Sequence, residues 1–116
     1  MLWFVTVTVA GPAVDPGEVR AALERLSTSQ AFVASVRYSA DRAEVRYWDE
    51  ADSIAVVIAQ GLRMWAENEA GAGLPEWSVV GLEVVDRDTT RLRWERDDPR
   101  VLVLGEVRPF EESDRR

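Results

Sequence analysis

The fold is constrained most by the order along the chain of two hydrophobic patterns, one typical of strands and one typical of helices. In some segments apolar and polar residues alternate one by one, which is the period of a strand with one buried face. In others, apolar residues recur at the spacing of a helical turn. The segments follow in this order: strand 3–9, helix 16–26, strands 32–38 and 43–48, helix 50–70 and strand 77–85. This β-α-β-β-α-β order predicts a sheet with two helices on one face.

Residues at the ends of the two helical segments support these boundaries. Asp15 and Pro16 are typical of a helix start, because Asp accepts hydrogen bonds from free amide groups and Pro fits the first turn. The second helical segment is followed by Gly71 and Gly73, and Pro75 prevents its continuation. The sequence therefore predicts two separate helices with defined ends.

The C-terminal part of the chain adds a further expected element. Arg91–Glu95 alternates and Val101–Leu104 is an uninterrupted apolar run, so we expect a β-hairpin over residues 91–107. A chain of 116 residues has room for one domain. We expect a single α+β domain over residues 1–108, a two-layer βαββαβ (ferredoxin-like) sandwich with an added C-terminal β-hairpin. Residues 109–116 are expected to be a disordered tail.

The second helical segment has the wider apolar zone. Val56 and Ala59 lie outside its main stripe, which indicates that the helix is covered on more than one side. Gly61 would allow a close approach to the sheet. The residues expected to face the core are Ile54, Val57, Ile58, Leu62 and Trp65.

Three residue types with chemical roles are missing from the chain. Cys and His are absent, and all 14 basic residues are Arg, so Lys is absent as well. These absences exclude thiolate zinc sites, Ser-His-Asp hydrolases, Cys-His proteases, lysine Schiff bases and a lysine-containing phosphate loop. We expect no catalytic residue, no metal site and no cofactor.

The charge balance bears on partners and location. The formal net charge is −7, which disfavours binding to nucleic acids or to anionic membranes. The N-terminal segment reads as a strand rather than a signal peptide, and no apolar stretch reaches the ~20 residues of a membrane span. The expected location is the cytoplasm.

Aromatic residues outside the expected core are the most unusual feature. Of the five tryptophans, Trp48, Trp77 and Trp94 fall outside the core stripes. Large aromatics with Arg are enriched at protein interfaces. The alternative is that the C-terminal hairpin and tail fold back and bury them. The candidate interface or pocket residues are Phe4, Arg37, Arg46, Tyr47, Trp48, Trp77, Trp94, Leu102 and Leu104.

The second face of the sheet, away from the helices, is also a candidate interface. It is too apolar for plain solvent and too charged for a core. Its expected residues are Phe4, Thr6, Thr8, Ser35, Arg37, Glu44, Arg46, Trp48, Val79 and Glu83. The leading hypothesis is a small non-enzymatic module that self-associates as a homodimer, or docks on a protein partner, through this face and the C-terminal hairpin.

Two other hypotheses remain open. One is a small-molecule site or cofactor-independent enzyme in a dimeric α+β barrel, with candidates Arg37, Tyr47, Trp48, Trp65 and Asn68. It requires a cavity of at least roughly 300 Å³. The other is an acidic inhibitor or antitoxin-like protein that binds a basic partner surface. Its candidate residues are Asp41, Glu44, Asp49, Glu50 and Asp52.

Overall fold

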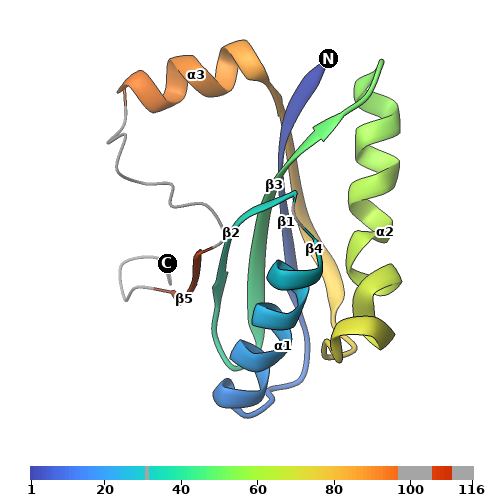
Figure 1. Cartoon of the computed structure of the whole chain (residues 1–116), viewed down its shortest axis with the longest axis vertical. Coiled ribbons are helices and arrows are strands. Elements are labelled where there is room, and N and C mark those ends of the chain that lie inside the picture. The colour runs from blue at the N-terminus through green and yellow to red at the C-terminus, as the bar shows by residue number, and fades with distance from the viewer. Residues whose placement is uncertain (31, 97–105, 111–116) are drawn as a thin grey trace.

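The computed structural model describes residues 1–30, 32–96 and 106–110 and has α+β architecture (Figure 1). The elements are β1 (Leu2–Ala10), α1 (Pro16–Ser29), β2 (Val33–Tyr38), β3 (Arg42–Glu50), α2 (Ile54–Ala72), β4 (Ser78–Asp86), α3 (Arg87–Arg96) and β5 (Glu106–Pro109). The predicted ferredoxin-like βαββαβ order is confirmed by the first six elements.

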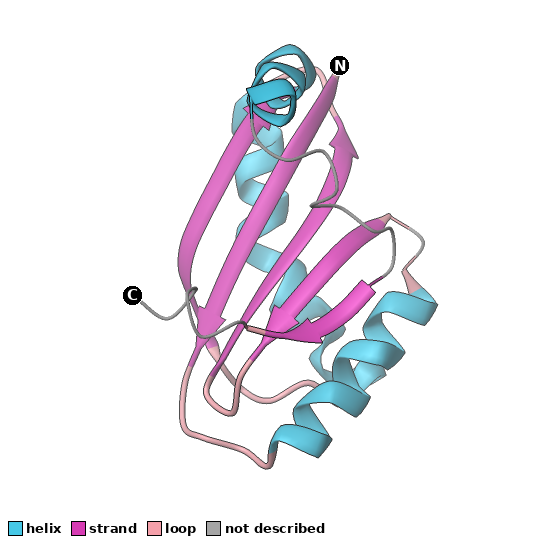
Figure 2. Ribbon diagram, turned by 90° about the vertical axis from the view of Figure 1, so that its left-hand side faces the viewer, coloured by secondary structure: helices cyan, strands magenta, loops and turns pink. Residues whose placement is uncertain are grey.

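The strands form a sheet in the order β4-β1-β3-β2-β5. Strand β1 lies between β4 and β3 and is antiparallel to both, as β2 is to β3, whereas β5 is parallel to β2. Helices α1 and α2 cover one face, with α2 over β1 and β4 and α1 over β2 and β5 (Figures 1 and 2). The other face is seen from the front in Figure 2.

Local capping explains where the two long helices begin and end. Asp15 Oδ2 accepts a hydrogen bond from Glu18 N at 3.2 Å, as predicted for the start of α1. Helix α2 begins later than expected, at Ile54, because β3 stays paired with β1 through Glu50, and Ser53 then caps the helix. The helix ends at Gly73, whose φ of 70° is the left-handed conformation that glycine adopts without strain.

The buried face of α2 differs from the predicted stripe. The buried residues include Val57, Gly61, Met64 and Trp65. Helix and sheet approach each other at Gly61, where an added Cβ would lie 2.9 Å from Leu82 Cδ1. This contact orients the helix so that three predicted core residues face outward. The exposed fractions are 45% for Ile54, 37% for Ile58 and 52% for Leu62.

An irregularity between β1 and β4 corrects two positions in β4. Thr8 is opposite Gly81 and Val9 is opposite Val79, so Val80 is an extra residue at the bulge. Val79 therefore shares the helix-covered face with Val9 and packs against the core, instead of lying on the second face. Val80, which regular alternation from Val79 on the second face would put on the core side, is 57% exposed.

The first strand of the predicted C-terminal hairpin is wrong, because Arg91–Glu95 lies within α3. Asp86 starts this helix: its Oδ1 accepts from Thr89 N at 2.7 Å, and Thr90 Oγ1 donates to Asp86 O at 2.8 Å. These local bonds favour a helix over the short alternating pattern. Val101–Leu104, the other expected hairpin strand, lies outside the described residues.

Strand β5 follows at the β2 edge and extends into the segment expected to be a tail. It includes Pro109, and Phe110 N donates to Tyr38 O at 2.8 Å. Residues 111–116 lie outside the described part of the chain. In that part, no helix combines the length and apolar character that crossing a membrane requires.

Candidate functional site

The second face of the sheet brings together four of the predicted site residues. Arg37, Arg46, Phe4 and Trp48 project from neighbouring strands β2, β3 and β1 on the side away from α1 and α2. Phe4 and Trp48 are directly opposite each other in the register, and their ring centroids lie 4.9 Å apart. Phe4 is only 8% exposed and is packed within the protein, whereas Trp48 is half-buried.

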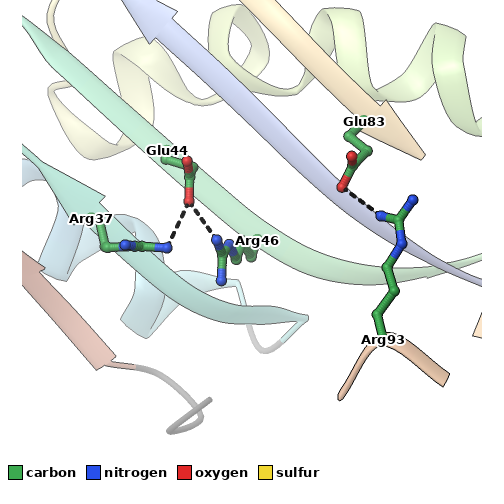
Figure 3. A network of polar contacts seen from close by, with 5 residues as sticks. All are labelled: Arg37, Glu44, Arg46, Glu83 and Arg93. Carbon is green, nitrogen blue, oxygen red and sulfur yellow. Dashed lines mark ion pairs between the residues drawn. The ribbon is translucent and has the colours of Figure 1, made fainter. Parts of the chain in front are cut away.

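Arg37 and Arg46 share one carboxylate on this face (Figure 3). Glu44 Oε1 lies 3.0 Å from Arg46 Nη2 and 3.4 Å from Arg37 Nη2. The three side chains are 16–22% exposed, so they are largely shielded from solvent. Glu44 Oε1 and the neighbouring Arg46 Nε are buried without a directed hydrogen bond within the described residues. These two ion pairs join the three side chains into a triad.

Helix α3 lies on the same side of the sheet, at one end (Figures 1 and 2). It contacts β1 and β4, and Thr90 is buried to 3% exposure. A second ion pair joins Arg93 of α3 to Glu83 of β4 at 3.4 Å, with both side chains more than half exposed (Figure 3). The described part of α3 thus covers one end of this face.

The remaining predicted interface residues do not gather there. Trp77 is 5% exposed and belongs to the core, where its ring stacks on Trp65. Tyr47 points to the helix-covered face. The side chain of Trp94 and residues Leu102 and Leu104 lie outside what the structure describes.

A second surface was not predicted as a site and is here called the α2–β4 surface. It consists of Ile54, Ile58 and Leu62 on α2 with Val80 and Leu82 on β4. Apart from the half-buried Leu82, these side chains are among the most exposed large apolar residues of the described chain. Strand β4 is the edge of the sheet, and no described strand pairs with its outer side. The apolar width of α2 in the sequence was the signal for this surface.

A third feature is a pocket of about 480 Å³, open to solvent, between the C-terminal end of α1, the end of β3 and the middle of α2. Tyr47, Trp48 and Asn68 line it, which are three of the five residues predicted for a small-molecule site. Arg37 lies on the opposite sheet face and Trp65 is buried in the core at 1% exposure. The other lining residues are Gln30, Phe32, Asp49, Gln60, Met64 and Glu67.

Burial and the charge of Asp49 raise the pKa of Tyr47 to about 12. The Tyr47 hydroxyl therefore stays protonated at neutral pH. Among the described residues, no three carboxylates gather as a set of metal ligands.

The acidic residues of the third hypothesis are spread over the fold. Asp41 lies in the turn before β3, whereas Asp49 and Glu50 lie at the far end of that strand, roughly 25–30 Å away at ~3.3 Å per residue. Glu44 lies between two arginines on the second face. The five predicted residues do not share one face.

Fold and surfaces together define a ferredoxin-like α+β protein with a five-stranded sheet. The chain belongs to the family described as "Domain of unknown function (DUF8830)", whose family model matches residues 2–100. No curated protein matches the sequence. A crystal structure of acylphosphatase from Bacillus subtilis is similar at 16% identity and a TM-score of 0.35, covering 75% of this chain and 87% of that one. This likeness carries no argument about activity.

Proposed function

We propose that this protein is a non-catalytic module that self-associates as a homodimer through the α2–β4 surface. The observation that supports the proposal is the exposure of Ile58 and Leu62 on α2, a helix that packs over β4, whose outer side pairs with no described strand. No charged residue occurs from Ile54 to Leu62. Exposed apolar surface of this kind is typical of protein interaction sites.

The outer edge of β4, which is unpaired within the described part of the chain, supports a strand-mediated contact. An unpaired edge offers a row of amide and carbonyl groups to any other strand, and proteins usually protect such edges with charges, prolines or a cover. Strand β4 contains no proline, and Glu83 is the only charged residue between Ser78 and Val85. Glu83 points to the second face, where it pairs with Arg93. The bulge at Val80 is the main irregularity of this edge.

The sequence of β4 suits pairing with a second copy of itself. In an antiparallel pair centred on Leu82, Val80 lies opposite Val84 of the second copy and Gly81 lies opposite Glu83. No like charges face each other in this register, whereas a pair centred on Glu83 would oppose two carboxylates. We therefore expect the two β4 strands to pair in the Leu82-centred register.

The same arrangement brings the two α2 helices together. A two-fold axis perpendicular to the sheet keeps both helix layers on one side of a continuous sheet. The flank of α2 that carries Ile58 and Leu62 then faces the equivalent flank of the second copy. Burying an aliphatic side chain contributes roughly 1.5–3 kcal/mol, and a standard interface covers roughly 800 Å² per partner. Strand pairing and helix packing together would supply this apolar burial and this interface area.

The experiment compares two exposed positions on the same helix. Leu62→Glu places a charge within the proposed interface, and Val56→Glu places the same charge on a different side of α2, roughly 160° around the helix from Ile58. Val56 is 46% exposed and Leu62 is 52% exposed, so neither change disturbs the core. Light scattering after size-exclusion chromatography should give a dimer for the unmodified chain and Val56→Glu, and a monomer for Leu62→Glu.

Two results would contradict the proposal. One is equal dissociation by both substitutions, which would indicate a general effect of charge on α2. The other is a dimer that survives Leu62→Glu and also Ile58→Glu but dissociates on Trp48→Ala, which would place the contact on the second face of the sheet. Circular dichroism confirms that each variant is folded before its mass is compared.

A further inference from the structure

The pocket between α1, β3 and α2 exists because β3 is longer than its neighbour. Strand β2 begins at Val33, which pairs with Tyr47. Beyond this point β3 continues through Trp48 and Asp49 to Glu50, where β1 is its one partner among the described strands. No described strand extends β2 alongside these residues, and the pocket of about 480 Å³ is lined by Trp48 and Asp49. This volume is within the usual range for small-molecule sites, roughly 300–1,000 Å³.

The walls of the pocket are held in place by contacts between the residues that line it. Phe32 and Tyr47 meet edge to face, with ring centroids 5.2 Å apart. Asn68 Nδ2 donates to Met64 O at 2.8 Å, and Gln30 Nε2 donates to Asn68 Oδ1 at 3.1 Å, which joins the end of α1 to α2. These bonds fix two sides of the opening in position before any ligand arrives.

The charged residues of the described pocket lining are all acidic. Asp49 and Glu67 are the charged residues among the described residues that line the pocket. Two aromatic rings on the helix-covered side, Phe32 and Tyr47, line it with them, and Phe32 is 39% exposed. Trp48 also lines the pocket, although its ring packs against Phe4 on the second face of the sheet. Aromatic faces attract organic cations and carboxylates add a longer-range attraction, whereas both repel anions. The high pKa of Tyr47 keeps its hydroxyl neutral.

We propose that this pocket binds a small organic cation, a free metabolite that carries a quaternary or protonated ammonium group against the aromatic lining and beside Asp49 and Glu67. The site lies on the side of α2 away from Ile58 and Leu62. It therefore stands independently of self-association, and a monomeric variant would retain it.

The test is a titration of the protein with choline, followed by amide chemical shifts in NMR spectra. Saturable shifts are expected at residues 30, 32, 47–49 and 60–68. The matched ligand is the uncharged isostere of choline, in which carbon replaces the ammonium nitrogen. It should bind more weakly by about twofold to thirtyfold, which is the range of a cation–π contact at partly exposed to desolvated sites.

Charge-neutral variants locate the site. Asp49→Asn and Glu67→Gln should each weaken choline binding several-fold, and Phe32→Leu should do so by removing one aromatic ring. Glu76→Gln removes the same charge from an exposed position in the loop after α2 and should leave binding unchanged. If Glu76→Gln weakens binding as much as Asp49→Asn, the attraction comes from the net charge of the protein and the proposal fails.

Three further outcomes would overturn the assignment. Equal affinity for choline and its uncharged isostere would show that the pocket selects shape and not charge. Failure of choline, tetramethylammonium and spermidine to give saturable shifts would show that the pocket takes no ammonium ligand. Tighter binding of a trimethyllysine peptide than of any free ammonium compound would assign the site to a protein side chain.

Discussion

Trp65 and Trp77 stack in parallel in the core, with ring centroids 6.0 Å apart and planes inclined by 3°. Each indole N–H donates to a backbone carbonyl, Trp65 Nε1 to Pro75 O at 2.9 Å and Trp77 Nε1 to Pro12 O at 2.9 Å. The pair therefore links the end of α2, the loop after β1 and the start of β4. Each ring buries its apolar surface against the other, and each indole N–H has a hydrogen-bond acceptor.

Removal of one ring of this pair should be costly. Trp77→Ala is expected to lower the free energy of unfolding by about 3–5 kcal/mol, because it leaves a cavity beside Trp65. Urea denaturation followed by circular dichroism measures this loss. Leu92→Ala, at a residue 62% exposed on α3, should change stability by less than about 0.5 kcal/mol. A loss below about 1 kcal/mol for Trp77→Ala would show that the ring is not part of the core.

The approach of α2 to the sheet predicts opposite outcomes at two glycines of the same helix. At Gly61 an added Cβ would lie 2.9 Å from Leu82 Cδ1, whereas at Gly71 it would meet nothing within 4 Å. Gly61→Val should destabilise the protein by about 1–3 kcal/mol through overpacking. Gly71→Val should be neutral or slightly stabilising, because valine has the higher helix propensity. Thermal denaturation of both variants decides the question, and equal effects would contradict the packing described.

Tyr47 makes stability depend on pH in the alkaline range. Burial, and to a lesser extent Asp49, raise its pKa from 10.0 to about 12. Because the folded protein holds this proton more tightly than the unfolded chain, the contribution is complete below pH 10.0 and is lost as pH rises towards 12. Tyr47→Phe should therefore lose less stability than the unmodified protein across this window. Parallel pH profiles of the two proteins, measured by urea denaturation, would contradict the raised pKa.

The shared carboxylate of Glu44 should contribute more than an exposed ion pair. Glu44→Gln leaves two largely shielded guanidinium groups without their common partner and is expected to cost about 1 kcal/mol. Glu24→Gln breaks the exposed pair with Arg20, whose side chains are 55% and 53% exposed, and should cost at most about 0.5 kcal/mol. Denaturation at low and high salt compares the two variants. A smaller effect at Glu44 than at Glu24 would contradict the shielding of the triad.

The sequence predicts most of the sheet because its strands alternate and its turns carry typical residues. It does not predict the orientation of α2, because the decisive contact is made by Gly61, which has no side chain to mark a stripe. The bulge at Val80 is hidden for a similar reason: an extra residue in one strand leaves the pattern of each strand intact. The segment Arg91–Glu95 alternates like a strand, and it is helical because local hydrogen bonds to Asp86 start α3.

The candidate surfaces were predictable in part. Tyr47, Trp48 and Asn68 were identified as pocket residues, and the pocket contains all three. Phe32 and Glu67 were missed as pocket residues, because their proximity depends on where β2 starts relative to β3. The exposed flank of α2 was visible only as an excess of apolar residues, and its position above the edge strand required the strand order.

Sedimentation equilibrium of the unmodified chain over a range of concentrations tests self-association most directly. The chain mass is 13.0 kDa, and the account predicts an average mass that approaches twice this value as the concentration rises. Interfaces of standard size have dissociation constants at or below the micromolar range, so the transition should be complete by about 100 µM protein. A single species of 13.0 kDa at every concentration would contradict the proposed function.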